Sequence, residues 1–349
     1  MGPGPAVADI RNAVRDCLAD LTTASSEPGL LVLAACSGGA DSLALAAALA
    51  FVGPRLGLCC GGVTVDHGLQ DGSAERAATV AMTLTGLGLE PVYSLAVQVP
   101  AVGGPEAAAR VARYQALDQL ARPAPARSTP PSPILSATPT PTLPAAAILL
   151  GHTLDDQAET VLLGLARGAG GRSLAGMPAR RGPYRRPLLG IRRSATMAAC
   201  AELGLEPWHD PHNADDRYAR ARVRHQALPA LEKALGPGVA QALARTATQL
   251  RQDADCLDDL AFAEGEHIRG AASDPAGLDV RWLAALPAAI RTRVLRQAAI
   301  SAGCPAGALT AGHVQRADEL VTCWHGQRWA DLPGGVRVRR RDGKLWFAG

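Results

Sequence analysis

Apolar runs and helical stripes alternate along the first half of the chain. The segment 30–36 is apolar throughout and ends at a glycine-rich turn, which is typical of a buried parallel strand, and a helix is predicted at 42–52. The same alternation continues with strands predicted at 58–65, 91–97 and 146–151, and helices at 6–22, 74–88, 105–121 and 154–167. The pattern therefore predicts an α/β domain with a parallel sheet.

The second half of the chain has a different, mainly helical pattern. Apolar positions form one stripe from Val239 to Ala261, with charged residues between them. Further helices are predicted at 286–301 and 310–323, and 331–347 is strand-like. The change near residue 236 predicts two domains, a parallel-sheet domain at 1–235 and a smaller, mainly helical domain at 236–349.

The segment 123–144 interrupts the alternation of strands and helices. It holds eight of the 26 prolines of the chain and no acidic residue. Such a composition cannot bury an apolar core, so a disordered or extended insertion is predicted at about 122–145. A tolerated surface loop is the preferred interpretation.

The composition narrows the class of protein. A length of 349 residues favours two domains. None of the eight cysteines lies in a C-x-x-C pair, which argues against a zinc or iron–sulfur site with that spacing and favours reduced thiols. No apolar run reaches the ~18–20 residues of a membrane helix, and the N-terminus is too polar for a signal peptide. A cytoplasmic protein with no membrane partner is expected.

The strongest candidate for chemistry is a glycine- and serine-rich turn between the first predicted strand and its helix. Glycines let backbone N–H groups approach an anion, and the helix N-terminus adds unpaired donors and a positive dipole end. The turn lacks the lysine of a P-loop, and G-x-G-x-x-G does not occur in the chain. A plain capped turn is the alternative. The residues concerned are Ser37, Gly38, Gly39, Ala40, Asp41 and Ser42.

Two more polar segments follow strands of the same predicted sheet. Asp66 and His67 end the second strand, and ligands of open parallel sheets bind at the carboxyl ends of strands. After the fourth strand, His152, Asp156 and Glu159 are spaced i, i+4 and i+7, so they share one helix face, and we expect that face to point into the cleft at the carboxyl ends of the strands. The two acids are suited to holding Mg²⁺ or an ammonium group. A turn and a capped helix with solvated acids are the alternatives.

Arginine dominates the basic residues, since only two of the 35 Lys and Arg residues are lysines. Between residues 180 and 224, ten arginines accompany five acids. Such a patch neutralises phosphates and favours nucleic-acid binding, although a GC-rich genome and a solvated, ion-paired helix face are alternatives. The candidates for RNA contacts are Arg186, Arg192, Arg217, Arg220, Arg222 and Arg224.

These motifs together resemble those of one known family. The turn at 37–42 is similar to the S-G-G-x-D-S pyrophosphatase loop (PP-loop) of the N-type ATP pyrophosphatases. D-H-G-L at 66–69, H-x-x-D-D-Q-x-E-T at 152–160, R-P-L-L at 186–189 and N-x-D-x-x-Y-x-R-x-R-x-R at 213–224 follow in order. The set resembles the tRNA(Ile)-lysidine synthetase family, strongly over about 30–235 and more loosely over 250–349. His209 departs from it, because the family usually has a glutamate there.

The resemblance implies a carbon–nitrogen ligase that uses ATP and Mg²⁺. It implies that L-lysine is joined to C2 of the wobble cytidine of isoleucine tRNA with the anticodon CAU, through an adenylated cytidine, with release of pyrophosphate and AMP. By the same resemblance, the turn at 37–42, Asp66 and His67 bind ATP, and Asp41 is a candidate magnesium ligand. The lysine site is His152, Asp156 and Glu159, the catalytic residues are Asp41, Arg113 and Asp156, and the six arginines and the second domain contact the tRNA.

Two other classes of protein stay open at this point, as does a homodimer. A tRNA-thiolating relative commonly carries paired catalytic cysteines, which this chain lacks. A non-catalytic RNA-binding relative would not need Asp41, Asp156 and Glu159, which are all present.

Overall fold

The structure, a computed structural model, separates into two compact units. The first comprises Met1–Arg167 with Gly176–Ala247, and the second Gly168–Ala175 with Thr248–Gly349. Helix α10 (Val239–Ala271) has residues in both units, so the domain boundary predicted near residue 236 stays a prediction. The residues described are 2–24, 29–68, 72–98, 105–121, 144–168, 170–210, 215–271 and 277–349, and nearly all of the predicted proline-rich insertion lies outside them.

The first unit is built on a six-stranded sheet with the strand order β3-β2-β1-β4-β6-β5. Strands β3, β2, β1, β4 and β6 are parallel, and only β5 pairs antiparallel, with β6. The parallel α/β fold predicted from the sequence is confirmed, whereas the short β5–β6 hairpin was not predicted. The strands are β1 Leu31–Ala35, β2 Cys59–Asp66, β3 Val92–Ala96, β4 Ala145–Leu150, β5 Arg180–Arg181 and β6 Tyr184–Arg185.

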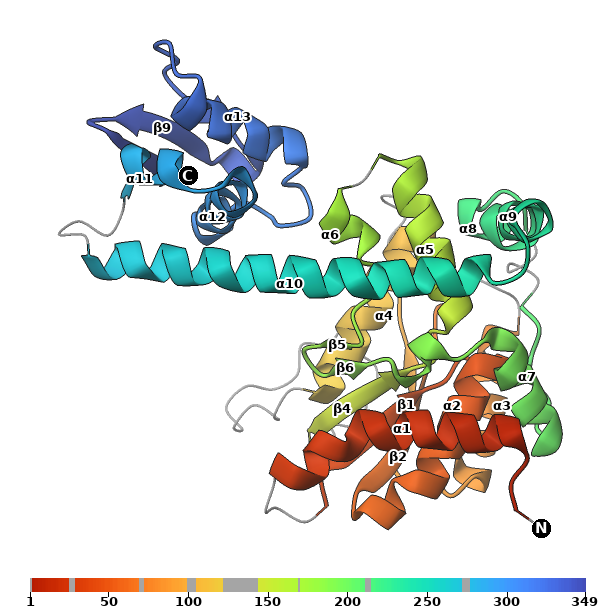
Figure 1. Ribbon diagram of the computed structural model, residues 1–349. Helices are drawn as coiled ribbons and strands as arrows, with labels where there is room; N and C mark the ends of the chain where they lie inside the picture. Colours follow the sequence, from red (N-terminus) through yellow and green to blue (C-terminus); the bar gives the residue numbers. More distant parts are fainter. Residues whose placement is uncertain are drawn as a thin grey trace. The chain divides into compact units, whose positions relative to one another are not determined.

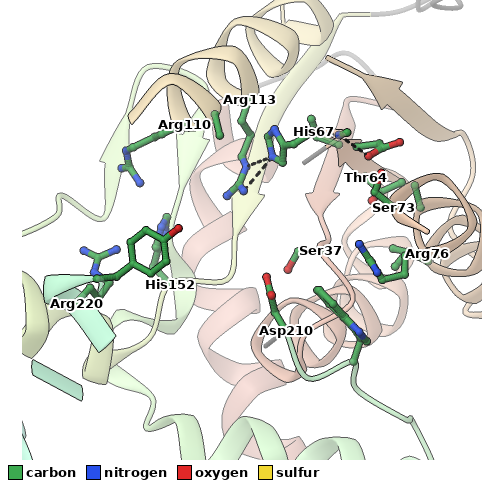
Figure 2. A pocket seen from close by; sticks show the side chains of 18 of the residues that line it. Ser37, Thr64, His67, Ser73, Arg76, Arg110, Arg113, His152, Asp210 and Arg220 are labelled. Atoms are coloured by element: carbon green, nitrogen blue, oxygen red, sulfur yellow. Dashed lines mark hydrogen bonds between the residues drawn. The ribbon is translucent and has the colours of Figure 1, made fainter. Parts of the chain in front are cut away.

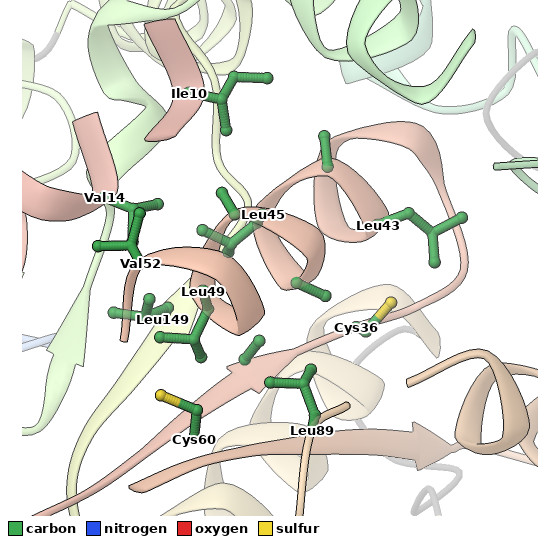
Figure 3. Close-up of a cluster of buried hydrophobic side chains, with 14 of the residues drawn as sticks. Ile10, Val14, Cys36, Leu43, Leu45, Leu49, Val52, Cys60, Leu89 and Leu149 are labelled. Carbon is green, nitrogen blue, oxygen red and sulfur yellow. The ribbon is translucent and has the colours of Figure 1, made fainter. Parts of the chain in front are cut away.

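Helices cover both faces of this sheet (Figure 1). Leu149 of β4 packs in one apolar cluster with Leu49 of α2 (Figure 3), and the adjacent Ile148 packs in another with Leu117 of α4. Both faces are apolar because successive side chains of a strand point to opposite sides. The helices are α1 Pro5–Ala24, α2 Ala40–Val52, α3 Ser73–Gly86, α4 Pro105–Ala121, α5 Leu154–Ala166, α7 Arg193–Glu202, α8 Ala219–Arg222 and α9 Leu228–Leu235, with 3₁₀ turns at Pro54–Leu56 and Pro187–Gly190 and a π-helical turn at Val223–Ala227.

The order of the strands reverses at β1. Strands β2 and β3 lie on one side of β1, and β4 lies on the other. In open parallel sheets, ligands bind outside the carboxyl ends of the strands at such a reversal. The loops that follow β1 and β4 are therefore the place to look for a functional site.

The second unit contains a four-stranded antiparallel sheet with the order β7-β10-β9-β8. Its apolar core joins α11, α12 and α13 to this sheet. The two helices predicted here correspond to α12 and α13, and the strand-like tail forms β8 to β10, but the three residues of β7 were not predicted. The elements are α6 Gly171–Leu174, β7 Gly277–Asp279, α11 Val280–Ala285, α12 Ala288–Ser301, α13 Ala311–Thr322, β8 Ala330–Asp331, β9 Arg337–Arg341 and β10 Lys344–Ala348, with a 3₁₀ turn at Pro333–Gly335.

The described part of the chain contains no helix with the length and apolar character needed to cross a bilayer.

Candidate active site

The carboxyl ends of β1 and β4 bring two polar segments together. Gly151 follows β4 and lies against the start of α2, where a Cβ atom would be 3.1 Å from the carbonyl oxygen of Asp41. A side chain at this position would press on the backbone, so the approach favours glycine. The segments that begin at Ser37 and at His152 are therefore neighbours in the fold.

The loop from Ser37 to Ser42 is held in shape largely by its own serines. The Ser37 N–H donates to the Ser42 hydroxyl (3.2 Å), which donates to the Gly39 carbonyl oxygen (2.9 Å). Gly38 has a φ of +85°, and a Cβ there would lie 2.9 Å from Cγ2 of Val80. Helix α2 begins directly after Gly39 and adds N-terminal amides and a positive dipole end. The arrangement suits a phosphate chain.

A cavity of about 520 Å³ opens beside this loop (Figure 2). Its size is that of a small-molecule site, and its wall holds more arginines than acids, which favours an anionic ligand. The predicted residues in the wall are Ser37, Asp66, His67, Arg113, His152, Arg220 and Arg224. The other predicted residues lie outside the wall, namely Gly38, Gly39, Ala40, Asp41, Ser42, Asp156, Glu159, Arg186, Arg192, Arg217 and Arg222. The wall also contains Arg76, Arg110, Trp208, Asp210 and Tyr218, which were not predicted.

Two neutral histidines line the cavity. Nε2 of His67 accepts a hydrogen bond from Nε of Arg113 (3.1 Å). Burial, helped by the charge of Arg113, lowers the pKa of His67 to about 4. Burial also lowers the pKa of His152 to about 4, although Asp156 opposes this shift. Nδ1 of each ring is buried and has no hydrogen-bond partner among the residues that the structure describes, so a polar atom of a ligand would satisfy it.

Asp41 connects the loop with helix α7. Its Oδ1 accepts a hydrogen bond from the Thr196 hydroxyl, and its Oδ2 accepts one from Nε of Arg193 (3.3 Å). Burial raises the pKa of Asp41 above its usual value, and the bonds to Thr196 and Arg193 limit the rise.

Asp156 and Glu159 are buried and ion-paired with arginines. The sequence had led us to expect that they face the cavity. Nη2 of Arg193 lies 2.7 Å from Oδ1 of Asp156, and Nε of Arg224 lies 2.7 Å from Oε1 of Glu159. Burial alone would raise the pKa of Asp156, but Arg193 and the N–H of Thr153 outweigh it, so that pKa lies below its ordinary value. The Thr153 N–H bond (2.8 Å) also makes Asp156 part of the cap of α5.

The six arginines predicted to contact RNA lie in different environments. Arg220 and Arg224 line the cavity. Arg186 is only 5% exposed and donates to a backbone carbonyl oxygen (2.9 Å), which favours a role inside the protein. Arg192 is half-buried and pairs with a carboxylate at the start of α5 (3.2 Å). Arg217 and Arg222 are exposed.

Sequence reasoning missed the part played by Arg193. Its guanidinium contacts Asp41, Asp156 and Glu159, which are 152, 37 and 34 residues away in the chain. No local pattern marks such a residue, because its partners come from other elements of the sheet domain. The arginine-rich composition was the one signal that included it.

The residues in place do not form a ready metal site. Within the described ranges, no group of three or more His, Cys, Asp and Glu side chains is arranged to hold a metal ion. Both carboxylate oxygens of Asp41 already accept hydrogen bonds. Magnesium at Asp41 therefore stays a prediction.

The fold and the loop define a PP-loop protein. The family model described as "PP-loop domain" matches residues 11–128 and 140–231. A solved structure with a similar fold is the U34-tRNA thiolase NcsA from Methanococcus maripaludis, at a TM-score of 0.51 and 18% identity, over 70% of this chain and 79% of that one. At this identity the likeness concerns the fold alone.

A second family model and two full-length relatives identify the family more closely. Residues 278–346 match the model described as "TilS substrate binding domain". A tRNA(Ile)-lysidine synthase of Thermobifida fusca (strain YX) is 56% identical, over 99% of this chain and 98% of that protein. Another, of Streptomyces coelicolor, is 52% identical over 99% of both. The chain belongs to the tRNA(Ile)-lysidine synthase family, which confirms the resemblance found in the sequence.

Proposed function

We propose that this protein joins L-lysine to C2 of the wobble cytidine of isoleucine tRNA with the anticodon CAU, giving lysidine. The reaction consumes ATP, passes through an adenylated cytidine and releases pyrophosphate and AMP, so the enzyme is a carbon–nitrogen ligase. The observation that carries the proposal is the meeting of the Ser37–Ser42 loop and the His152–Glu159 segment at the reversal of the sheet. Two substrates that must react can be held there within reach of each other.

The loop and the cationic wall serve the first step. The loop amides between these two serines, from Gly38 to Asp41, hold the phosphate chain and stabilise the charge that grows on the departing pyrophosphate. Asp66 and His67 line the nucleotide side of the cavity, and His67 fixes the guanidinium of Arg113. Arg113 stabilises the charge that develops when the cytidine oxygen is adenylated.

The acids serve the second step. Asp156 and Glu159 hold the ammonium groups of lysine before attack, and the amine must lose a proton to become a nucleophile. The neutral ring of His152 adds no positive charge beside the amine, and its Nδ1 atom has no hydrogen-bond partner within the described ranges. The target cytidine has to be turned out of the anticodon loop to enter the cavity.

The tRNA requires a larger surface than the cavity. Arg217 and Arg222 are exposed and suit contacts with phosphates, and we assign the same role to Arg192, which directly precedes α7. The second unit carries the match to the substrate binding domain and is proposed to contact the body of the tRNA. The reaction is proposed to occur in the cytoplasm, and a homodimer stays a prediction.

Product analysis tests the proposal. The purified chain is incubated with a CAU-anticodon isoleucine tRNA transcript, ATP, Mg²⁺ and radiolabelled lysine, and the tRNA is digested to nucleosides. We expect label in one modified cytidine together with released pyrophosphate. Sulfur transfer in place of lysine would identify a thiolase, and tRNA binding without pyrophosphate release would identify a non-catalytic relative. Either result would refute the proposed function.

A further inference from the structure

Acids and arginines form one ion-pair network beside the cavity. The acids come from α2 and α5, and the arginines from the segments at 192–193 and 220–224. The members are the four acids Asp41, Asp155, Asp156 and Glu159, and the four arginines Arg192, Arg193, Arg220 and Arg224. With all eight groups ionised the charges balance. An additional ammonium group would therefore leave one positive charge uncompensated, which is costly away from water.

Two of these arginines separate the acids from the cavity. Arg220 and Arg224 line the cavity, whereas Asp156 and Glu159 do not. The Glu159 side chain has no exposed surface, and that of Arg224 is 22% exposed. Arg224 reaches both acids, at 3.3 Å from Asp156 and 2.7 Å from Glu159, and Arg220 lies 3.5 Å from Glu159. An amine that enters through the cavity meets these guanidinium groups before it meets a carboxylate.

Arg193 is the third arginine that pairs with Asp156 and Glu159, and further contacts hold it in place. Arg193 also pairs with Asp41 (3.3 Å), and its backbone N–H donates to Asp155 (2.8 Å). It does not line the cavity. Arg193 therefore continues to compensate part of the acidic charge when the two cavity-facing arginines move away. The network has a fixed cation on one side and two cations next to the substrate space on the other.

Phosphate is the ligand most suited to drawing those two cations away. A guanidinium fork forms two parallel, charge-assisted hydrogen bonds with a phosphate group, and the gain offsets the loss of an ion pair. The cavity borders the phosphate-binding loop at Ser37, so a phosphate there lies in the same space as Arg220 and Arg224.

We propose that Arg220 and Arg224 form a removable arginine cover on the amine site. In the free protein these two arginines form ion pairs with Asp156 and Glu159. When a phosphate-bearing substrate enters the cavity, they turn to its phosphate and leave the two carboxylates to the ammonium of lysine. The arginines act as positioning residues, and lysine binding depends on the other substrate. This inference rests on the proposed function, since it takes lysine as the ligand of the acids.

Equilibrium dialysis of radiolabelled lysine with the full-length protein tests the cover. Four arms contain no addition, a non-hydrolysable ATP analogue, the CAU-anticodon tRNA, or both. We expect the Kd for lysine to fall at least tenfold in one or more of the phosphate-bearing arms, and the effective arm identifies the nucleotide or the tRNA as the source of the phosphate. A change below threefold in all arms, or no lysine binding in any arm, overturns the inference.

Variants separate the cover from a merely structural role. Arg224→Gln removes the charge but can still hydrogen-bond, so lysine should bind without a phosphate ligand. Adding the ATP analogue or the tRNA should then change the Kd for lysine by less than threefold. Arg224→Lys keeps the cation and should keep the dependence. The exposed Arg181 of β5 offers a matched control, since Arg181→Gln leaves the network intact and should keep the full dependence. If Arg224→Gln weakens lysine binding equally in all arms, its role is structural and the inference fails.

The product assay distinguishes the two failures. If lysidine forms while lysine binding is independent of ATP and tRNA, the arginine cover is wrong and the proposed function stands. If no lysine is joined to the tRNA, the proposed function itself fails.

Discussion

The two halves of the candidate active site are built in opposite ways. The Ser37–Ser42 loop uses backbone amides, glycine geometry and one helix N-terminus, and its shape is held largely by bonds within a few residues. The acid pair at Asp156 and Glu159 depends on charges supplied by arginines from distant parts of the chain. The first half is ready for an anion, whereas the second is already occupied by the protein's own cations. A preformed subsite and a closed subsite thus lie beside the same cavity.

Asp41 belongs to both halves, so its loss should have the largest effect. Asp41→Asn removes the charge that pairs with Arg193 while keeping the size of the side chain. We expect tRNA-dependent pyrophosphate release to fall by about 100-fold or more, in line with the loss of one well-placed electrostatic group in a transition state. The measurement is a single-turnover pyrophosphate assay.

Thr196→Val is the graded comparison for Asp41. It removes the hydroxyl that donates to Asp41 but leaves the carboxylate in place. Its effect on the same assay should be clearly smaller. Equal losses in the two variants would mean that the hydrogen bond, not the charge, carries the role of Asp41.

One added methyl group should disrupt the preformed half, the Ser37–Ser42 loop. Gly38→Ala places a Cβ at a φ of +85° and 2.9 Å from Val80, at a cost of roughly 1–2 kcal/mol, so the KM for ATP should rise about tenfold. Gly39 has a φ of −74°, and a Cβ there meets only Ser37 Oγ at 3.8 Å. Gly39→Ala is therefore the matched control and should change the KM much less. Equal effects would contradict a loop whose shape depends on Gly38.

Each exposed arginine of the patch at 180–224 should have a smaller effect, and this effect is on tRNA binding. Arg217 is exposed and pairs with Asp215 (2.7 Å), so Arg217→Gln should weaken tRNA binding only about threefold and lower the salt slope by about one. Filter binding at several salt concentrations measures both values. An unchanged salt slope would remove Arg217 from the set of phosphate contacts.

The smallest predicted effect is on the way the free energy of unfolding depends on pH. His67 takes up a proton near pH 6.5 when unfolded but only at about pH 4 when folded. Between these values the unfolded chain binds more protons, so the free energy of unfolding falls as the pH drops from about 6.5 toward 4. His67→Gln, which can still accept the Arg113 bond, should show a smaller decrease in Tm between pH 7 and pH 5. An equal decrease in both proteins would contradict the buried neutral ring.

The difference between the two halves also explains what the sequence could predict. The parallel strands, the loop and the positions of His152 and Asp156 follow from local patterns, since a buried strand and its turn are contiguous in the chain. The pairing of Arg193 with Asp41 across 152 residues leaves no local trace, and neither does the burial of Glu159. We expected those acids to be open to the cavity, because a helix face shows which side chains align but not what covers them. The three-residue strand β7 was missed for the same reason, since it is defined by its pairing with β10.

The central claim is that the two halves, on either side of one cavity wall, serve two successive steps of one reaction, and Asp156→Asn tests it most directly. Pyrophosphate release from ATP plus the CAU tRNA and incorporation of labelled lysine are measured in the same reaction, after circular dichroism has shown that the variant is folded. We predict that pyrophosphate release continues within about tenfold of the unmodified protein, while lysine incorporation is lost. Loss of both activities in parallel, or near-normal lysine incorporation, would contradict the account.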